Sequence, residues 1–111
     1  MKMIIAIIQP QQLPDIKEAL LTAGFENMTC TNILGTVANQ HEEHKYRGVS
    51  QEIYLFQKIR LEIGVADEKV EELIEALSSG VKESGGSGLA FVSELSDCVM
   101  LGTGVRGESV L

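Results

Sequence analysis

The alternation of apolar and polar positions predicts four short strands along the chain. Apolar and β-branched runs at residues 3–8, 28–34 and 89–92 have the length and composition typical of strands. Between residues 55 and 63, apolar side chains alternate with charged ones, which indicates a strand with one apolar and one polar face. The short run at residues 98–101 is compatible with a fifth strand.

Two segments carry the apolar spacing of an amphipathic helix, with apolar side chains at positions i, i+3, i+4 and i+7. The first stripe begins at Ile16 and ends before Gly24, a residue type that favours the left-handed conformation just after a helix. The second stripe covers residues 70–77, with Asp67 as the expected N-cap and Gly80 as the expected end.

The predicted order is strand, helix, strand, long loop, strand, helix, strand, which is the βαββαβ order of the ferredoxin-like α+β fold. A chain of 111 residues fits one domain, so residues 1–111 are expected to form a single unit around one core. Two helices can cover only one face of a four-stranded sheet. We therefore expect the chain to associate with copies of itself, because the second face would otherwise meet water.

Charge and composition narrow the range of partners. The formal net charge is −7 and the 9 Lys and Arg residues are scattered, so nucleic acid is not expected as a partner. The longest apolar run, at residues 3–8, is far too short to span a bilayer. Because the N-terminus lacks a signal-peptide pattern, we expect a cytoplasmic protein without direct membrane insertion. Cys30 and Cys98 are isolated in the sequence and are interpreted as small buried apolar residues.

The polar segment between residues 36 and 54 has no strand or helix periodicity and is the first candidate for function. Connections longer than about 12 to 15 residues inside a small domain are usually functional or disordered. Tyr46 and Arg47 are residue types that anchor protein interfaces, which favours a partner-binding loop over an idle one. His41 and His44 in the same segment could instead ligate zinc, copper or nickel.

A second candidate is the glycine-rich segment SGGSG at residues 84–88. Its backbone N–H groups could receive an anion, as phosphate-binding loops do, but a flexible turn before the last strand explains the same glycines. Catalysis has little support, because Glu42 and Glu43 are paired acids in the polar segment, where burial is not expected to tune a pKa. We therefore expect no catalytic residues and no enzymatic activity.

Several sequence motifs resemble those of PII nitrogen-regulatory proteins. They include the opening MKMIIAIIQP, the segment GFENMTCTNILGT around Thr29 and Gly35, and the tripeptide YRG at residues 46–48. The resemblance continues through KIRLEIGVADEKVEELIEAL at residues 58–77, the glycine-rich segment and the closing GTGVRGESVL. It covers nearly the whole chain.

The resemblance implies a homotrimer of ferredoxin-like subunits with adenine nucleotides bound in clefts between neighbouring subunits. It also implies a T-loop, at about residues 36–54, that docks onto a membrane transporter or a metabolic enzyme. On this resemblance, the effector-binding positions are Thr29, Gly35, Thr36, Asn39, Lys58, Gly64, Gly86, Ser87, Gly88 and Thr103. The partner-binding positions of the loop are His44, Tyr46, Arg47, Gly48 and Gln51.

The chain departs from the family's pattern where phosphate would bind. Leu89 stands where the family has a lysine, and Met100 and Gly102 stand where it has arginines. Asn39 replaces a glutamine of the T-loop base, and Gln51 replaces the tyrosine that is uridylylated. We therefore expect a regulatory protein with no required cofactor that binds ADP or AMP more readily than ATP. The alternatives are a metal-binding or metal-tolerance trimer that uses His41 and His44, and a structural adaptor without a ligand.

Overall fold

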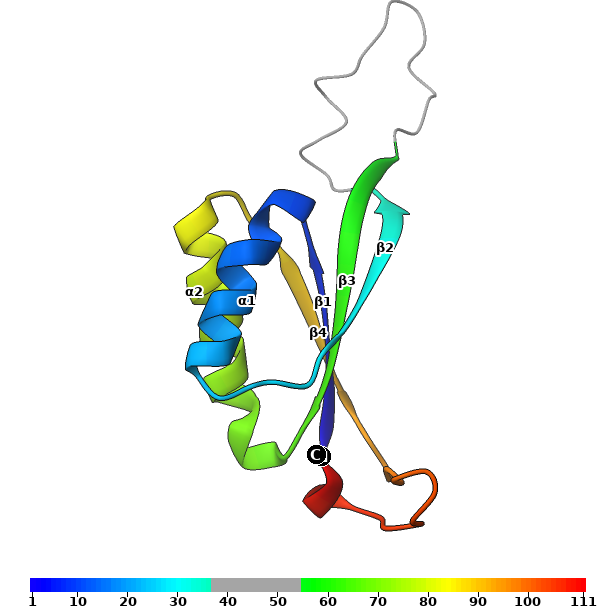
Figure 1. Cartoon of the computed structure of the whole chain (residues 1–111). Coiled ribbons are helices and arrows are strands. Elements are labelled where there is room, and N and C mark those ends of the chain that lie inside the picture. The colour runs from blue at the N-terminus through cyan, green and yellow to red at the C-terminus, as the bar shows by residue number, and fades with distance from the viewer. Residues whose placement is uncertain (37–54) are drawn as a thin grey trace, which may run out of the picture.

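The chain forms an antiparallel sheet of four strands with two helices against it (Figure 1). This computed structural model describes residues 1–36 and 55–111. The strands follow the spatial order β2-β3-β1-β4, which confirms the ferredoxin-like α+β fold. The strands are β1 (Lys2–Ile8), β2 (Thr29–Gly35), β3 (Phe56–Val65) and β4 (Leu89–Glu94), and the helices are α1 (Leu13–Thr22) and α2 (Val70–Ser84).

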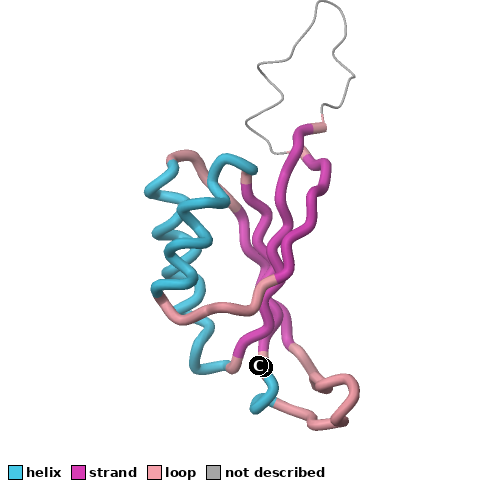
Figure 2. The backbone as a smooth tube through the Cα atoms, viewed as in Figure 1, coloured by secondary structure: helices cyan, strands magenta, loops and turns pink. Residues whose placement is uncertain are grey.

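Both helices pack on the same face of the sheet, and the core lies between the two layers (Figure 2). Side chains from the two central strands alternate toward this core, as the period of two predicts. The fully buried side chains at its centre come from both layers; they include Ile4, Ile16, Leu20, Leu61 and Leu73. One helical face and one sheet face therefore account for the hydrophobic stabilisation of the fold.

The opposite face of the sheet, here called the open face, carries the other set of alternating residues. In the strand register, Ile5 pairs with Glu62 on β3 and with Phe91 on β4, so these three side chains share the open face. Leu89 and Phe91 are more than half exposed. The sequence left undecided which set of β3 would meet water, and the register assigns the Lys58, Arg60 and Glu62 set to the open face.

The ends of the helices follow the sequence prediction only in part. Gly24 has a φ of 92° just after α1, as expected for a residue that ends a helix. The predicted end of α2 at Gly80 is wrong, because the helix continues to Ser84 and turns at Gly85. A Cβ atom at Gly80 would lie 2.6 Å from Ile16 Cα, so this glycine serves the close approach of α1 and α2.

Three other local predictions are also wrong. Asp67 is not the N-cap of α2, since that position is held by Lys69; the Asp67 Oδ1 accepts a hydrogen bond of 2.8 Å from the Met1 amino group. The run at residues 98–101 contributes one isolated bridge, between Val99 and Arg106, in place of a fifth strand. Cys30 is exposed and Cys98 is only half-buried, so neither cysteine is a core residue.

Most of the expected T-loop lies outside the described residues. Of the loop positions named above, Thr36 alone is described; Asn39, His41, His44, Tyr46, Arg47, Gly48 and Gln51 lie outside. Among the helices of residues 1–36 and 55–111, none has the length and apolarity that crossing a membrane requires.

Candidate functional site

A polar cleft lies where β2 begins and β3 ends. It has a volume of about 440 Å³, and its lining residues are Met3, Glu26, Asn27, Met28, Thr29, Glu62, Gly64, Val110 and Leu111. Two of the predicted effector positions, Thr29 and Gly64, therefore lie in one cleft. Thr29 is paired with Glu62 in the strand register, so the two residues stand side by side on the open face. The Thr29 hydroxyl can donate or accept a hydrogen bond there, and the Glu62 carboxylate can accept one from a polar ligand group.

Glu62 is a cleft residue that the sequence reasoning missed. Its position on the polar side of β3 was visible from the alternation, but the alternation did not show that it faces Thr29 across the β2–β3 pair. Gly64 has a packing role in the same cleft. A Cβ atom there would lie 3.1 Å from Leu111 Cδ2, so the glycine makes room for a C-terminal side chain against the sheet.

A second group of predicted positions lies at the other end of the sheet. Gly35 ends β2 beside Lys58, with its ideal Cβ position 3.7 Å from Lys58 Cγ. Lys58 is only 3% exposed, and its Nζ lies 6.0 Å from the centre of the Phe56 ring. Burial lowers the pKa of Lys58, because desolvation disfavours the charged amine. A cation in such surroundings attracts an anion more strongly than a solvated lysine does.

The glycine-rich segment also lies at this end, because it leads into the first residue of β4, next to the last residues of β1. Gly85 and Gly86 both have positive φ angles, of 87° and 89°. Gln12, which is fully buried, donates from Nε2 to Gly85 O at 2.9 Å and to Ser87 O at 3.2 Å. Gln12 is a second site residue that sequence reasoning missed, since its tertiary contact has no signature in the local pattern.

The predicted positions thus form two groups separated by the length of the strands. Thr29 and Gly35 are the first and last residues of β2, six steps apart. At about 3.4 Å per residue this corresponds to roughly 20 Å. Thr103 lies in a local turn of the C-terminal segment, where its exposed hydroxyl accepts a hydrogen bond from Val105 N. A single chain therefore does not bring all the predicted effector positions together.

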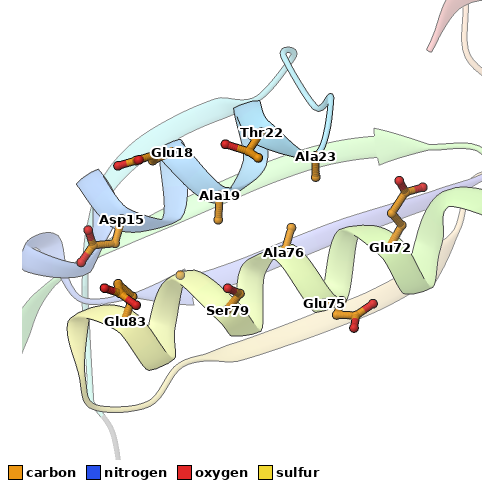
Figure 3. Close-up of a pocket in the computed structure, with 11 residues that line it drawn as sticks. Asp15, Glu18, Ala19, Thr22, Ala23, Glu72, Glu75, Ala76, Ser79 and Glu83 are labelled. Atoms are coloured by element: carbon orange, nitrogen blue, oxygen red, sulfur yellow. The ribbon is translucent and has the colours of Figure 1, made fainter.

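Another hollow, of about 570 Å³, lies between α1 and α2 (Figure 3). Its walls carry five carboxylate side chains, and no lysine or arginine lines it among residues 1–36 and 55–111; the carboxylates are Asp15, Glu18, Glu72, Glu75 and Glu83. This concentration of negative charge repels anions. The helix groove is therefore unsuited to a phosphate-bearing ligand, in contrast to the end of the sheet that holds Lys58.

Metal ligation has no support in the described part of the chain. No group of three or more His, Cys, Asp or Glu side chains that could hold a metal ion occurs within residues 1–36 and 55–111. The predicted ligands, His41 and His44, lie outside these residues.

Two of the positions at which the resemblance implies a cation can be located in the structure. Leu89 and Met100 are exposed apolar side chains, 59% and 47% exposed, at places where the family resemblance implies positive charge. Arg106 is nearby in the sequence, but its Nη1 forms a 2.6 Å ion pair with Asp97. That bond lowers the pKa of Asp97, and it engages the arginine in the C-terminal segment.

Comparison with solved structures defines the class of protein. The structure of this chain is similar to the crystal structure of Arabidopsis thaliana PII bound to citrate, with a TM-score of 0.75 and 27% sequence identity. The similarity covers 97% of this chain and 89% of that one. The fold is thus that of a PII-type α+β protein.

Sequence comparison identifies the family. A family model described as nitrogen regulatory protein P-II matches residues 1–105. The nitrogen regulatory protein GlnK of Escherichia coli K12 is 30% identical over 112 aligned residues, which cover 100% of both chains. P-II 2 of Methanothermobacter thermautotrophicus is 34% identical, over 100% of this chain and 97% of its own length. The chain belongs to the P-II family of nitrogen regulatory signal-transduction proteins.

Proposed function

We propose that this chain is a regulatory sensor that binds an adenine nucleotide, such as ADP or AMP, in clefts between its own copies. Through the T-loop, at about residues 36–54, it would control a partner membrane transporter or metabolic enzyme without catalysing a reaction. The observation that carries the proposal is the division of the site residues into a polar cleft and a cationic, glycine-rich end. These are the two chemistries that a base and a phosphate need.

Self-association would complete the site. The two groups stand at opposite ends of β2, so a second copy has to bring its polar cleft to the cationic end of the first. Two features of the open face support such an assembly. Leu89 and Phe91 leave apolar surface exposed, and Arg60 Nε is buried without a hydrogen-bond partner within the described residues. A neighbouring copy would cover this apolar surface and could supply a hydrogen-bond acceptor for Arg60 Nε. On the family resemblance, we expect this assembly to be a homotrimer.

The charges favour a nucleotide with few phosphates. In the proposed site, Thr29 and Glu62 would meet the base, while Lys58 and the amides of Gly86 and Gly88 would meet the phosphates. Each charge-assisted hydrogen bond contributes about 1.5–3 kcal/mol, so the loss of several cations weakens the binding of a triphosphate most.

The proposed ligand lies where it can influence the T-loop. Gly35 ends β2 beside Lys58, and the chain enters the loop immediately afterwards at Thr36. A ligand shifts a loop between two states only as far as its affinity differs between them. A phosphate held by Lys58 is close enough to the loop base for such a difference to arise.

A thermal-shift panel tests the proposal directly. The purified protein is heated with ATP, ADP, AMP, 2-oxoglutarate, and zinc, copper or nickel ions. A ligand at one hundred times its dissociation constant adds about 2.7 kcal/mol to the stability of the folded state, so a bound nucleotide raises the midpoint visibly. We expect ADP or AMP to raise the thermal midpoint more than ATP does. A shift with metals alone that His44→Ala abolishes would replace the nucleotide proposal with metal binding.

A matched pair of variants locates the binding end. Lys58→Met should remove most of the nucleotide-induced shift, because it deletes the buried cation. Lys82→Met removes a lysine from the exposed surface of α2 and should leave the shift unchanged.

A further inference from the structure

The geometry points to Gln12 as the residue that orients the glycine-rich segment so that the N–H groups of Gly86 and Gly88 face an anion. This inference rests on the proposed function and adds a positioning residue to it. Gln12 touches no ligand in the proposed site. Its contribution is the direction in which two backbone dipoles point.

The Gln12 side chain is held in one orientation by three hydrogen bonds. Its Oε1 accepts from Gln9 N at 2.9 Å, which leaves Nε2 to face the glycine-rich segment. There the two protons of Nε2 meet the carbonyl oxygens of Gly85 and Ser87. The amide is fully buried and its donors and acceptor are matched with the correct partners, so reversing it would break all three bonds.

Peptide geometry converts these bonds into a direction for the N–H groups. In a trans peptide unit, the C=O of one residue and the N–H of the next point in opposite directions. None of the described peptide bonds is cis. When Gln12 draws Gly85 O and Ser87 O inward, the N–H groups of Gly86 and Gly88 are turned away from it. Both glycines are exposed, so these two donors face the outside of the molecule.

Gly86 itself fits this arrangement. A Cβ atom there would lie 3.1 Å from Gln12 Nε2, and its φ of 89° is unfavourable for other residues. The segment therefore packs directly on the Gln12 amide. The two outward N–H groups, on either side of Ser87, can donate to one anion without a lysine side chain. This offers a way to hold phosphate at the turn even though Leu89 stands at the position of the family's lysine.

The test compares ADP with adenosine, which lacks the phosphates, on three forms of the intact protein. Gln12→Met keeps the length of the side chain and removes its hydrogen bonds. Gln11→Met is the matched control, since Gln11 is exposed on the same turn and its Nε2 donates to the Gln9 side chain and not to the glycine-rich segment. Calorimetric titration measures both affinities on each form, and a thermal midpoint confirms that each form is folded.

We expect Gln12→Met to lower the affinity for ADP by roughly 10- to 100-fold and to leave the affinity for adenosine unchanged. Gln11→Met should change neither. If Gln12→Met keeps the full advantage of ADP over adenosine, Gln12 does not position the phosphate donors. If both affinities fall together, the role of Gln12 is merely structural and the inference is equally wrong.

A second measurement tests the inference even if the variant does not fold or the wild type does not bind ADP. Amide resonances of the wild-type protein are followed by nuclear magnetic resonance during a titration with pyrophosphate. The inference predicts saturable shifts at Gly86 and Gly88, and their absence would overturn it. If ADP does not bind but pyrophosphate shifts these two amides, the proposed nucleotide function fails while the anion-binding turn stands.

Discussion

The two faces of the sheet differ although the same strands supply both. On the helix-covered face, Ile4 and Leu61 are fully buried between the layers. On the open face, one step along each strand, Ile5 and Glu62 share a row with Phe91, which is 53% exposed. The covered face is apolar and is buried under the two helices of the same chain. The open face mixes apolar and charged residues, and it is the face that the proposed function assigns to a ligand and another copy.

This difference separates the residues that specify the fold from those that specify the function. A buried apolar face stabilises the monomer through the area that it removes from water. The residues of the open face lie outside that core, and the proposed function assigns them to a ligand cleft, a buried cation and an assembly surface. Variants on the two faces should therefore have separable effects.

The largest expected effect comes from the covered face. Leu61→Ala removes a fully buried side chain from the central strand and leaves a cavity between the layers. We expect the free energy of unfolding to fall by about 2–5 kcal/mol, measured by chemical denaturation. A loss smaller than half of the lower end of this range would contradict the central place of the covered face in the stability of the core.

An intermediate effect is expected on the open face, and on a different property. Phe91→Glu places a charge on the exposed apolar surface and should dissociate the assembly, as sedimentation velocity would show, while the monomer stays folded. Leu21→Glu is the control, because Leu21 is equally exposed, at 55%, but lies on α1. Dissociation by Leu21→Glu, or a stable assembly with Phe91→Glu, would contradict the assignment of the interface.

The smallest expected effect concerns the dependence of stability on pH. Burial lowers the pKa of Lys58 below its ordinary value of 10.5, so between these two pKa values the unfolded chain binds more protons than the folded one. Burial of the charged Lys58 lowers the free energy of unfolding, and this loss is recovered as pH rises through the window between the two pKa values. Denaturation at increasing pH should show this rise in the wild type and lose it in Lys58→Met. Lys82→Met should retain it.

The periodic elements of the fold were predictable from the sequence. The strands and α1 carry their own patterns, in which the spacing of apolar residues directly reports which side is buried. Gly80 is a residue whose role the spacing of apolar residues did not predict. A glycine inside a helix looks like a terminator in sequence, but here the decisive factor is a Cβ position 2.6 Å from Ile16 Cα on the other helix.

The sequence suggested the candidate positions but not their arrangement. The resemblance supplied Thr29, Lys58 and the glycines, while alternation alone could not reveal that Glu62 stands beside Thr29. The contact of Gln12 with the glycine-rich segment had no local signal, since it joins residues that are 73 and 75 positions apart. The separation into two groups at opposite ends of β2 follows from the order of the strands, and it becomes apparent only when the residues are placed on the sheet.

The central claim is that the nucleotide site is shared between copies of the chain. Calorimetric titration of ADP into the wild-type assembly and into the dissociated Phe91→Glu variant tests it most directly. The account predicts one ADP bound per chain in the assembly and no measurable binding by the folded monomer. Equal affinity in both forms would contradict it, because a complete site would then lie within a single chain.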